Sequence, residues 1–385
     1  MRFSSRGRGR RTWVCPHCFR RVGRGGFGFV CVTGGRECAE DRRLAAADPL
    51  DRRATCGTCG HLTTRRRCHA CGDRLPEGYL ESPGRIVALA GPVSSGKSTY
   101  IAVLVHELLH RLGDELGTSL VPCDDRTTDD YRERYERHLY DSHRTVPKTQ
   151  ERDGGRPLVY RLGRTRRGAF GRTRDTSLTL VFLDTAGEHF GSRDRMETRL
   201  RYLAEADAVV VLVDPGDVAG PDAASNPASG AAAGGAVRTA EHTAGPSTDV
   251  LTRVLRHLGE VHAPGGRRKV PVPVGVALTK LDLLWPRLPD NSPLHRTRTP
   301  GPVFDADDRA AVHTELRALL TGWQEGGLAR RLDQSCADYQ LFAVSMLGSS
   351  PRGTELGLGG VRPHRVEDPL MWLLHRFGML DRGTG

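Results

Sequence analysis

Long apolar runs, lysine and aromatic residues are all scarce in this chain of 385 residues. No stretch approaches the about 18 consecutive apolar residues that a membrane span needs. The arginine-rich first residues are not followed by the apolar segment of a cleaved export signal. Only four of the 57 cationic residues are lysines. We therefore expect a soluble cytoplasmic protein in which each lysine is informative, because some sites accept only the compact ammonium group.

The length predicts about two or three domains, and the hydrophobic content of 38% suffices for a packed core. We expect a disordered basic tail over residues 1–12, a zinc-ribbon-like domain over 13–80 and a larger domain over 85–380. The net charge of +11 suits nucleic acid or anionic lipid as a partner, but a solvated, arginine-biased surface explains it as well. Arginine runs over 1–24 and 65–67 leave nucleic acid binding open, although few aromatic residues are present for base stacking.

Eight of the ten cysteines lie before residue 72. Cytosolic thiols stay reduced, so the clustering indicates metal rather than disulfides. Two C-x-x-C turns have the spacing of a structural zinc site, with the ligands Cys56, Cys59, Cys68 and Cys71. A looser second set comprises Cys15, Cys18, Cys31 and Cys38, of which Cys38 is the weakest member. The sets can also interleave, and a thiolate can be replaced by His17, His61 or His69. We expect one or two zinc ions, which so small a domain would need to fold.

From residue 85 the pattern alternates strands and helices, which predicts an α/β fold with a mainly parallel sheet covered on both faces. The predicted strands span 85–91, 158–163, 177–184, 206–214, 272–278 and 339–345, the second and third forming an antiparallel hairpin at the sheet edge. The predicted helices span 98–112, 129–141, 194–205, 248–261, 306–322 and 366–377. We expect Gly113 to end the first helix and Thr127 or Thr128 to cap the second. The Ala/Gly/Ser/Pro-rich residues 216–247 should form a disordered insertion.

Residues 91–98 read Gly-Pro-Val-Ser-Ser-Gly-Lys-Ser, which fits the phosphate-binding pattern G-x-x-x-x-G-K-[ST] between a predicted strand and a predicted helix. Such a loop curls its backbone N–H groups round a phosphate, at a helix N-terminus that favours negative charge. Lys97 would neutralise the β- and γ-phosphate oxygens, and Ser98 would ligate Mg²⁺. The expected nucleotide contacts are Gly91, Ser94, Ser95, Gly96, Lys97, Ser98 and Thr99.

Three later segments indicate which nucleotide is bound. Residues 183–187 read Leu-Asp-Thr-Ala-Gly, where Asp184 can hold a water on Mg²⁺ and the Gly187 N–H can face a γ-phosphate. Residues 279–282 read Thr-Lys-Leu-Asp, where Asp282 can accept guanine N1–H and N2–H₂, a donor pair that adenine lacks. Thr279 opens this segment, the Lys280 stem would lie along the purine, and Ser345 suits a backbone clamp on the guanine O6. Two of the four lysines fall where these motifs require lysine, which favours GTP and GDP as ligands.

The motif order GPVSSGKS, DTAG, TKLD and a late Ser345 resembles the TRAFAC-type P-loop GTPases over about residues 85–380. Cysteine knuckles followed by CHACGDRLPEG and GPVSSGKSTYIAVL resemble, more narrowly, the bacterial double-GTPase family of predicted conflict systems. The resemblance implies Mg²⁺-dependent hydrolysis of GTP to GDP and phosphate, slow without a partner, and protein partners from the same system. It also implies a γ-phosphate-sensing threonine before the hairpin, either Thr145 or Thr149. We favour Thr149, because Pro147 rigidifies the approach to it.

The sequence departs from many relatives after DTAG, where Glu188 and His189 stand in place of a water-orienting glutamine. Either residue can position water, His189 with a pKa suited to the task, whereas Glu188 can instead repel phosphate and leave turnover slow. Arg144 or Arg152 could serve as an arginine finger. A switch GTPase is the leading hypothesis. The alternatives are a nucleotide-gated adaptor with little hydrolysis, whose zinc module binds protein or nucleic acid, and an ATPase.

Overall fold

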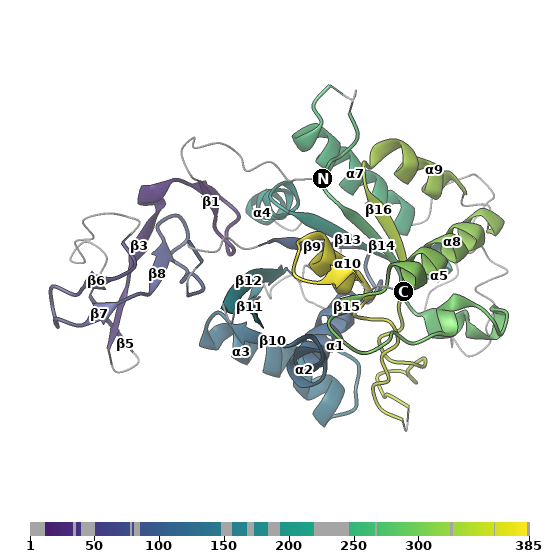
Figure 1. The fold of residues 1–385 in the computed structure, drawn as a ribbon, viewed down its shortest axis with the longest axis horizontal. Coiled ribbons are helices and arrows are strands. Elements are labelled where there is room, and N and C mark those ends of the chain that lie inside the picture. The colour runs from purple at the N-terminus through teal and green to yellow at the C-terminus, as the bar shows by residue number, and fades with distance from the viewer. Residues whose placement is uncertain are drawn as a thin grey trace.

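The computed structural model describes most of the chain in two parts, a cysteine-rich region within residues 12–80 and an α/β region within residues 85–382 (Figure 1). The described ranges are 12–33, 36–39, 51–77, 79–80, 85–147, 156–167, 173–183, 193–218, 246–265, 268–323, 326–357 and 359–382. Every structural statement below concerns these residues. None of their helices is both long enough and apolar enough to cross a membrane.

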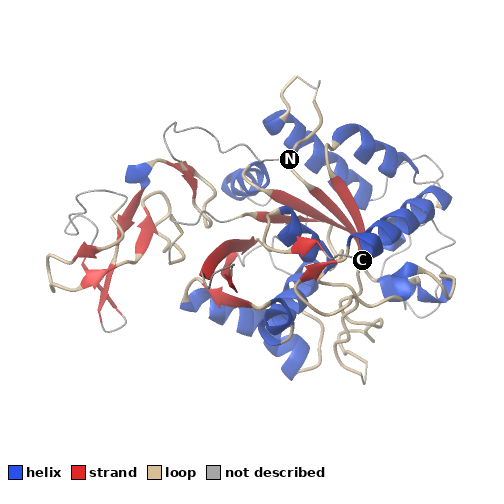
Figure 2. Ribbon diagram, in the orientation of Figure 1, coloured by secondary structure: helices blue, strands red, loops and turns tan. Residues whose placement is uncertain are grey.

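The centre of the α/β region is a four-stranded parallel sheet in the order β16-β14-β13-β9. Its strands are β9 (Val87–Ala90), β13 (Ala208–Val213), β14 (Val274–Leu278) and β16 (Tyr339–Ala343). Nearly all of their residues are buried, as expected for strands covered on both faces. The expected α/β fold is confirmed, with helices on either side of the sheet (Figure 2).

Alternating residues of the sheet enter two separate apolar layers. Val210 and Leu212 belong to the layer that includes α1 (Lys97–His110) and α10 (Asp368–Arg376). Val209, Val211 and Val213 belong to the opposite layer. The helices of that second layer are α4 (Arg193–Ala204), α7 (Pro246–His262), α8 (Ala306–Gly322) and α9 (Gly326–Ser335). The sheet is therefore the middle layer of a three-layer sandwich.

The expected hairpin is antiparallel, but it belongs to a second sheet in the order β10-β11-β12. Its strands are β10 (Thr118–Pro122), β11 (Leu158–Arg167) and β12 (Thr173–Phe182). The sequence pattern did not predict β10, which is short and ends in proline. The hairpin lies beside β9 at the edge of the central sheet, as expected, but it pairs with β10 in a sheet of its own, and a tyrosine hydroxyl bridges the two sheets.

That tyrosine is Tyr202 of α4, whose hydroxyl lies between β9 and β12. It accepts hydrogen bonds from the backbone N–H groups of Leu89 at 3.2 Å and Leu183 at 3.5 Å. The carbonyl of Val87 lies 2.8 Å from the same oxygen and that of Val181 lies 3.2 Å from it, so the single hydroxyl proton serves this pair. One buried side chain thus replaces a rung of backbone hydrogen bonds between the two sheets.

Two helix ends differ from expectation. Gly113 does not stop a helix. The break comes at Arg111, and Gly113 lies inside α2 (Leu112–Leu116), where a Cβ would come within 2.7 Å of the Leu108 carbonyl. The helix ends instead at Gly117, which has a left-handed φ of 58°. The cap of α3 (Asp125–Tyr131) is Asp124, which accepts from the Thr127 N–H, rather than either threonine.

A ten-residue π-helix, η3 (Arg132–Asp141), continues α3. The predicted apolar face of Tyr131, Tyr135 and Leu139 is buried, as expected. The predicted disordered insertion, 216–247, is too long at both ends. Its first residues, 216–218, belong to α5 (Pro215–Val218), and its last residues, 246–247, belong to α7. Residues 219–245 lie outside the described residues. The remaining short elements are η6 (Leu281–Leu283), η7 (Trp285–Arg287), η8 (Pro293–His295), β15 (Val303–Phe304) and β17 (Asp381–Arg382).

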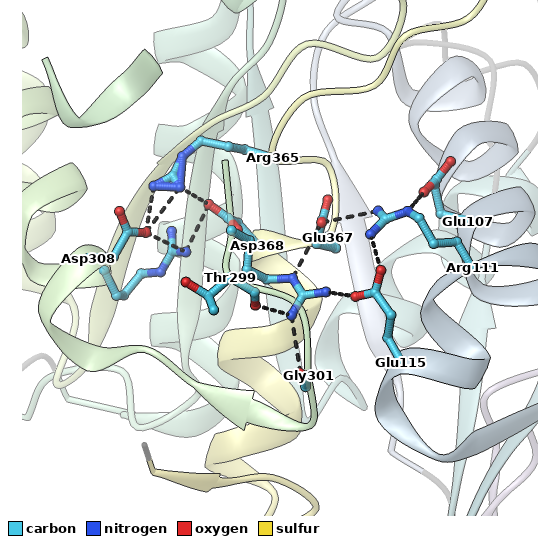
Figure 3. Close-up of polar contacts among 11 residues, drawn as sticks. Glu107, Arg111, Glu115, Thr299, Gly301, Asp308, Arg365, Glu367 and Asp368 are labelled. Atoms are coloured by element: carbon cyan, nitrogen blue, oxygen red, sulfur yellow. Dashed lines mark hydrogen bonds and ion pairs between the residues drawn. The ribbon is translucent and has the colours of Figure 1, made fainter. Parts of the chain in front are cut away.

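Buried ion pairs hold the amino end of α10 against its neighbours (Figure 3). Arg365 and Asp368 have fully buried side chains 3.4 Å apart, and Arg365 also lies 2.5 Å from Asp308 of α8. Glu367 accepts from Arg111, which stands between α1 and α2, at 3.2 Å. Because each buried charge faces an opposite one, the network fixes α2, α8 and α10 relative to one another.

The described residues of the cysteine-rich region form only short elements. They are β1 (Trp13–Val14), β2 (Arg21–Val22), η1 (Arg24–Gly26), β3 (Phe27–Phe29), β4 (Cys31–Thr33), β5 (Arg36–Ala39), β6 (Ala54–Thr55), β7 (Leu62–Thr63) and β8 (Arg66–Cys68). Its apolar contacts form two small clusters, one around Trp13 and Phe27 and one around Phe29 and Ala54. Cysteines are members of both clusters.

Candidate functional site

The loop between β9 and α1 is curled as its sequence predicts. Gly91 has a φ of 155°, and a Cβ there would lie 2.6 Å from the Ser95 Oγ and 2.8 Å from the Leu212 carbonyl. Gly96 has a left-handed φ of 85°, which glycine adopts without strain. Buried Lys97 donates from its Nζ to the carbonyls of Gly91 and Pro92, at 2.7 Å each. The ammonium group therefore spans the loop at the start of α1, where a phosphate would bind.

A second group of polar residues follows β14 and β16. Asp282 accepts a hydrogen bond from the Ser345 Oγ at 2.5 Å, and this oxygen in turn accepts from the Gly348 N–H at 3.0 Å. Thr279 is fully buried and donates from both N and Oγ1 to the carbonyl of Val213. These contacts hold the Asp282 carboxylate in one orientation.

The expectation for Ser345 needs correction. Its own backbone N–H donates to the His364 carbonyl at 3.0 Å, and the His364 backbone N–H donates to the Ser345 carbonyl at 2.8 Å. The amide is therefore engaged in a bridge and is not a free clamp for the guanine O6. The Ser345 side chain instead donates a hydrogen bond to the Asp282 carboxylate.

Asp214 is a site residue that the sequence interpretation missed. It follows β13, and its Oδ2 lies 2.5 Å from the Nζ of Lys280, while its Oδ1 accepts from the Gly216 N–H. Lys280 has a left-handed φ of 52°, which turns the chain between β14 and η6. An acid directly after a buried strand was the signal that could have found Asp214, in the same way as it drew attention to Asp184.

All these residues follow parallel strands, so they gather at one edge of the sheet. The phosphate loop follows β9, Asp214 follows β13, Lys280 and Asp282 follow β14, and Ser345 follows β16. A Cβ on Gly96 would lie 2.6 Å from the methyl of Met346, so the phosphate loop adjoins the loop after β16. The edge at the carboxyl ends of parallel strands is where such folds bind ligands.

The family comparison agrees with this geometry. The family model "Double-GTPase 2" matches residues 85–324. The chain belongs to the Double-GTPase 2 family. The resemblance to double-GTPases and to P-loop GTPases in general is therefore confirmed, and membership implies binding of guanine nucleotide with Mg²⁺.

This double-GTPase is also similar to individual known proteins. A protein of Mycolicibacterium smegmatis described as "Putative ESX-1 scaffolding and assembly protein SaeC" is 31% identical over 334 residues, which cover 81% of this chain and 80% of that protein. The small GTPase Arl6 of Trypanosoma brucei is 13% identical, with 77% of this chain and 99% of the other covered at a TM-score of 0.29. The signal recognition particle receptor complex of Chaetomium thermophilum is 12% identical, with 71% and 94% covered at a TM-score of 0.30.

The expected residues for γ-phosphate and water, Thr149, Asp184, Gly187 and His189, lie outside the described residues, as do Glu188 and Arg152. Of the predicted magnesium ligands, the structure therefore places Ser98 alone, at the second position of α1. Thr145, the alternative to Thr149, donates from its N–H to the Thr354 carbonyl at 2.8 Å. The roles of these residues stay predictions.

Eight of the ten cysteines of the double-GTPase form two groups of four, but the groups interleave along the sequence. Cys15 and Cys18 meet Cys68 and Cys71, and a second group consists of Cys31, Cys38, Cys56 and Cys59. The two consecutive sets favoured by spacing are therefore wrong, and the interleaved alternative is right. The reason is the antiparallel pairing of β3 with β8, which places Cys68 opposite Phe27. His17 and His69 replace no thiolate, since each faces a backbone carbonyl, that of Arg74 and that of Gly25.

Both groups fit a tetrahedral zinc ion. A Zn–S bond of about 2.3 Å implies sulfur atoms about 3.8 Å apart, and the Sγ atoms of Cys15 and Cys71 are 3.8 Å apart, those of Cys31 and Cys59 3.5 Å. Hydrogen bonds from the backbone N–H groups of Cys59 and Thr58 lower the pKa of the Cys56 thiol. The hydrogen bond between Cys15 and Cys18 lowers the pKa of Cys18 to about 7 and raises the pKa of Cys15, because one sulfur of the pair holds the proton. Thiolate character is what zinc requires.

The cysteine-rich region docks on α4 of the double-GTPase through the first knuckle. Phe19 follows Cys18 directly, has a left-handed φ of 56° and is buried within the second apolar layer of the α/β region. Its ring centroid lies 4.9 Å from that of Tyr202. Arg21 pairs with Glu205 at 2.7 Å beside this contact. The knuckle therefore rests on the tyrosine whose hydroxyl joins β9 to β12.

Proposed function

We propose that this chain is a Mg²⁺-dependent switch that binds GTP and hydrolyses it to GDP and phosphate. The observation that carries the proposal is the pairing, at one sheet edge, of a phosphate loop spanned by Lys97 with a carboxylate held by Ser345. Asp282 would accept guanine N1–H and N2–H₂ with its two oxygens. The Lys280 stem, fixed by Asp214, would lie along the purine.

The γ-phosphate end follows from the family resemblance. Ser98, Thr149 and Asp184 would complete the magnesium shell, Asp184 through a water, while the Gly187 N–H would face the γ-phosphate and His189 would position the attacking water. Loss of the γ-phosphate would then release the loops that contain Thr149 and Gly187. Glu188, in place of a neutral water-orienting side chain, favours slow turnover without a partner.

The described contacts support a route from this site to the cysteine-rich region. Leu183 donates to the Tyr202 hydroxyl and directly precedes Asp184. Tyr202 contacts Phe19, the residue after a zinc ligand. A displacement of the Asp184 segment would therefore reach the first knuckle through a single buried side chain.

The output that we propose is regulated binding of a protein partner by the zinc knuckles. The similar protein of M. smegmatis is described as a putative scaffolding and assembly protein. This description favours a role for the present chain as a component of a multiprotein assembly. A place in a bacterial conflict or defence system is a narrower form of this proposal. A nucleotide-gated adaptor with little hydrolysis is the second candidate, and Glu188 is the observation that favours it.

Nucleotide preference tests the proposal most directly. The Asp282→Asn variant should bind GDP about ten- to a hundredfold more weakly, since a hydrogen bond to a charged group contributes roughly 1.5–3 kcal/mol, and its preference should shift towards xanthine nucleotides. Asp290→Asn, an exposed neighbour, should bind GDP normally. Calorimetry on the zinc-replete full chain measures both. Equal affinity of the native chain for ATP and GTP would refute guanine specificity.

Single-turnover phosphate release separates the two candidate functions. A GTPase releases phosphate from bound GTP above the buffer rate, and His189→Ala should slow that release. If the native chain retains intact GTP with and without a partner, the adaptor replaces the enzyme.

A further inference from the structure

A group of metal-binding side chains lies away from both cysteine clusters and from the nucleotide edge. His106 and His110 stand one turn apart near the end of α1, and Glu136 faces them from η3. The Glu136 Oε1 is 3.9 Å from the His106 Nδ1 and 3.9 Å from the His110 Nε2. All three ligand atoms lie within 4.8 Å of one another.

Local structure prepares these side chains for a metal ion. A spacing of four residues places both imidazoles on one face of the helix. The His106 side chain is 22% exposed, and among the described residues its buried Nδ1 has no hydrogen-bond partner. Its ring stacks on Tyr140 at 3.5 Å, which fixes the ring plane.

We propose that His106, His110 and Glu136 form a zinc site that joins the phosphate-loop helix α1 to the π-helix η3. Two imidazoles and one carboxylate are a ligand set typical of Zn²⁺, with a fourth position left for water. Ligand atoms on a tetrahedral zinc ion lie about 3.4 Å apart, given bonds of about 2.0–2.1 Å. The three side chains need to close by little, and partly exposed His110 and Glu136 are free to do so.

The neighbouring residues favour a bridging role over hydrolysis. Residues 106–110 have the H-E-x-x-H spacing in which the intervening glutamate serves as a general base in zinc proteases. Here Glu107 accepts a hydrogen bond from the Arg111 Nε at 2.6 Å and belongs to the ion-pair network at α2. That carboxylate is thus held by an arginine instead of facing the zinc.

The position of the site gives it a consequence for the nucleotide edge. η3 ends at Asp141, eight residues before Thr149. Extended π-helix is rare and is found mostly at functional sites. Zinc bound to Glu136 would anchor η3 and so fix the start of the segment that leads to Thr149.

The test is a zinc titration of the full chain already holding its two tightly bound zinc ions. Calorimetry should detect a third equivalent. His110→Ala and Glu136→Gln should each weaken that third equivalent by at least about tenfold, since even residues that only orient ligands cost about 10–100-fold. His138→Ala and Glu133→Gln, on the same helix but outside the cluster, should bind it as the native chain does. GDP binding of each variant checks that the chain is folded.

Cobalt distinguishes the proposed site from the cysteine clusters. Co²⁺ added to the zinc-loaded chain should give visible bands without new thiolate-to-cobalt charge transfer. The proposal is overturned if no third equivalent binds, if both ligand variants bind it normally, or if the added cobalt shows thiolate charge transfer.

Discussion

The two regions of this protein reach order by opposite means. The α/β region buries a four-stranded sheet between two apolar layers, and its charged residues pair inside that framework. The cysteine-rich region has strands of two to four residues and two small apolar clusters, each including cysteines. Because the apolar area there is small, four thiolates round a zinc ion would supply the missing stability. Yet the regions meet at several contacts, among them Phe19 on Tyr202 and Arg21 with Glu205, so a disturbance in either can be followed in the other.

Removal of zinc should separate the stabilities of the two regions, and it should have the largest effect of the changes predicted here. Structural zinc contributes about 10 kcal/mol or more to the folding of such small sites, so strong chelation should unfold residues 12–80 and leave the α/β region folded. Limited proteolysis with mass spectrometry should show cleavage before residue 80, while GDP still binds to the remaining fragment.

A single thiol variant refines the same test. Cys68→Ser should lose one of the two tightly held zinc equivalents, whereas Cys123→Ser, whose thiol lies in neither cluster, should keep both. Simultaneous loss of GDP binding and of residues 85–382 on chelation would contradict the independence of the two regions.

The next largest effect concerns the buried charges of the α/β region. Asp368→Asn removes the carboxylate that faces both Arg365 at 3.4 Å and Arg309 at 2.8 Å. An uncompensated buried charge costs about 3–5 kcal/mol, and urea unfolding should show a loss of that size. Asp338→Asn, whose partner Arg376 is partly exposed, should cost less than about 1 kcal/mol. Equal losses would mean that burial of the pair is unimportant.

Local sequence patterns predicted the elements that are buried on both faces. The apolar runs of β9, β13 and β14 and the period of α8 were sufficient, because burial dictates residue type at each position. The polar residues at the strand ends were also predicted from local sequence, because Lys97 and Asp282 occupy fixed positions in short motifs.

What the sequence did not reveal depends on contacts between distant segments. The grouping of Cys15 with Cys68 follows from the pairing of β3 with β8, which no local pattern specifies. The bridge between Ser345 and His364 is a second example: the Ser345 N–H is engaged by a carbonyl 19 residues further along the chain, which the short motif does not contain. The sequence pattern of α4 predicts that Tyr202 is buried, but it does not show whether the hydroxyl group hydrogen-bonds to other strands.

The smallest effect that we predict measures that last difference. Tyr202→Phe deprives the N–H groups of Leu89 and Leu183 of their acceptor, and a buried unsatisfied group costs about 1–3 kcal/mol. Tyr160→Phe is the matched control, because among the described residues the Tyr160 hydroxyl is buried without a hydrogen-bond partner. Urea unfolding of the α/β region should show a loss for the first variant and little or none for the second. Because Phe19 packs on the Tyr202 ring, which both tyrosine and phenylalanine retain, the zinc knuckles should stay docked. Equal stability of the two variants would mean that the hydroxyl merely occupies the gap between β9 and β12, and the route from Asp184 to the knuckles would lose its physical basis.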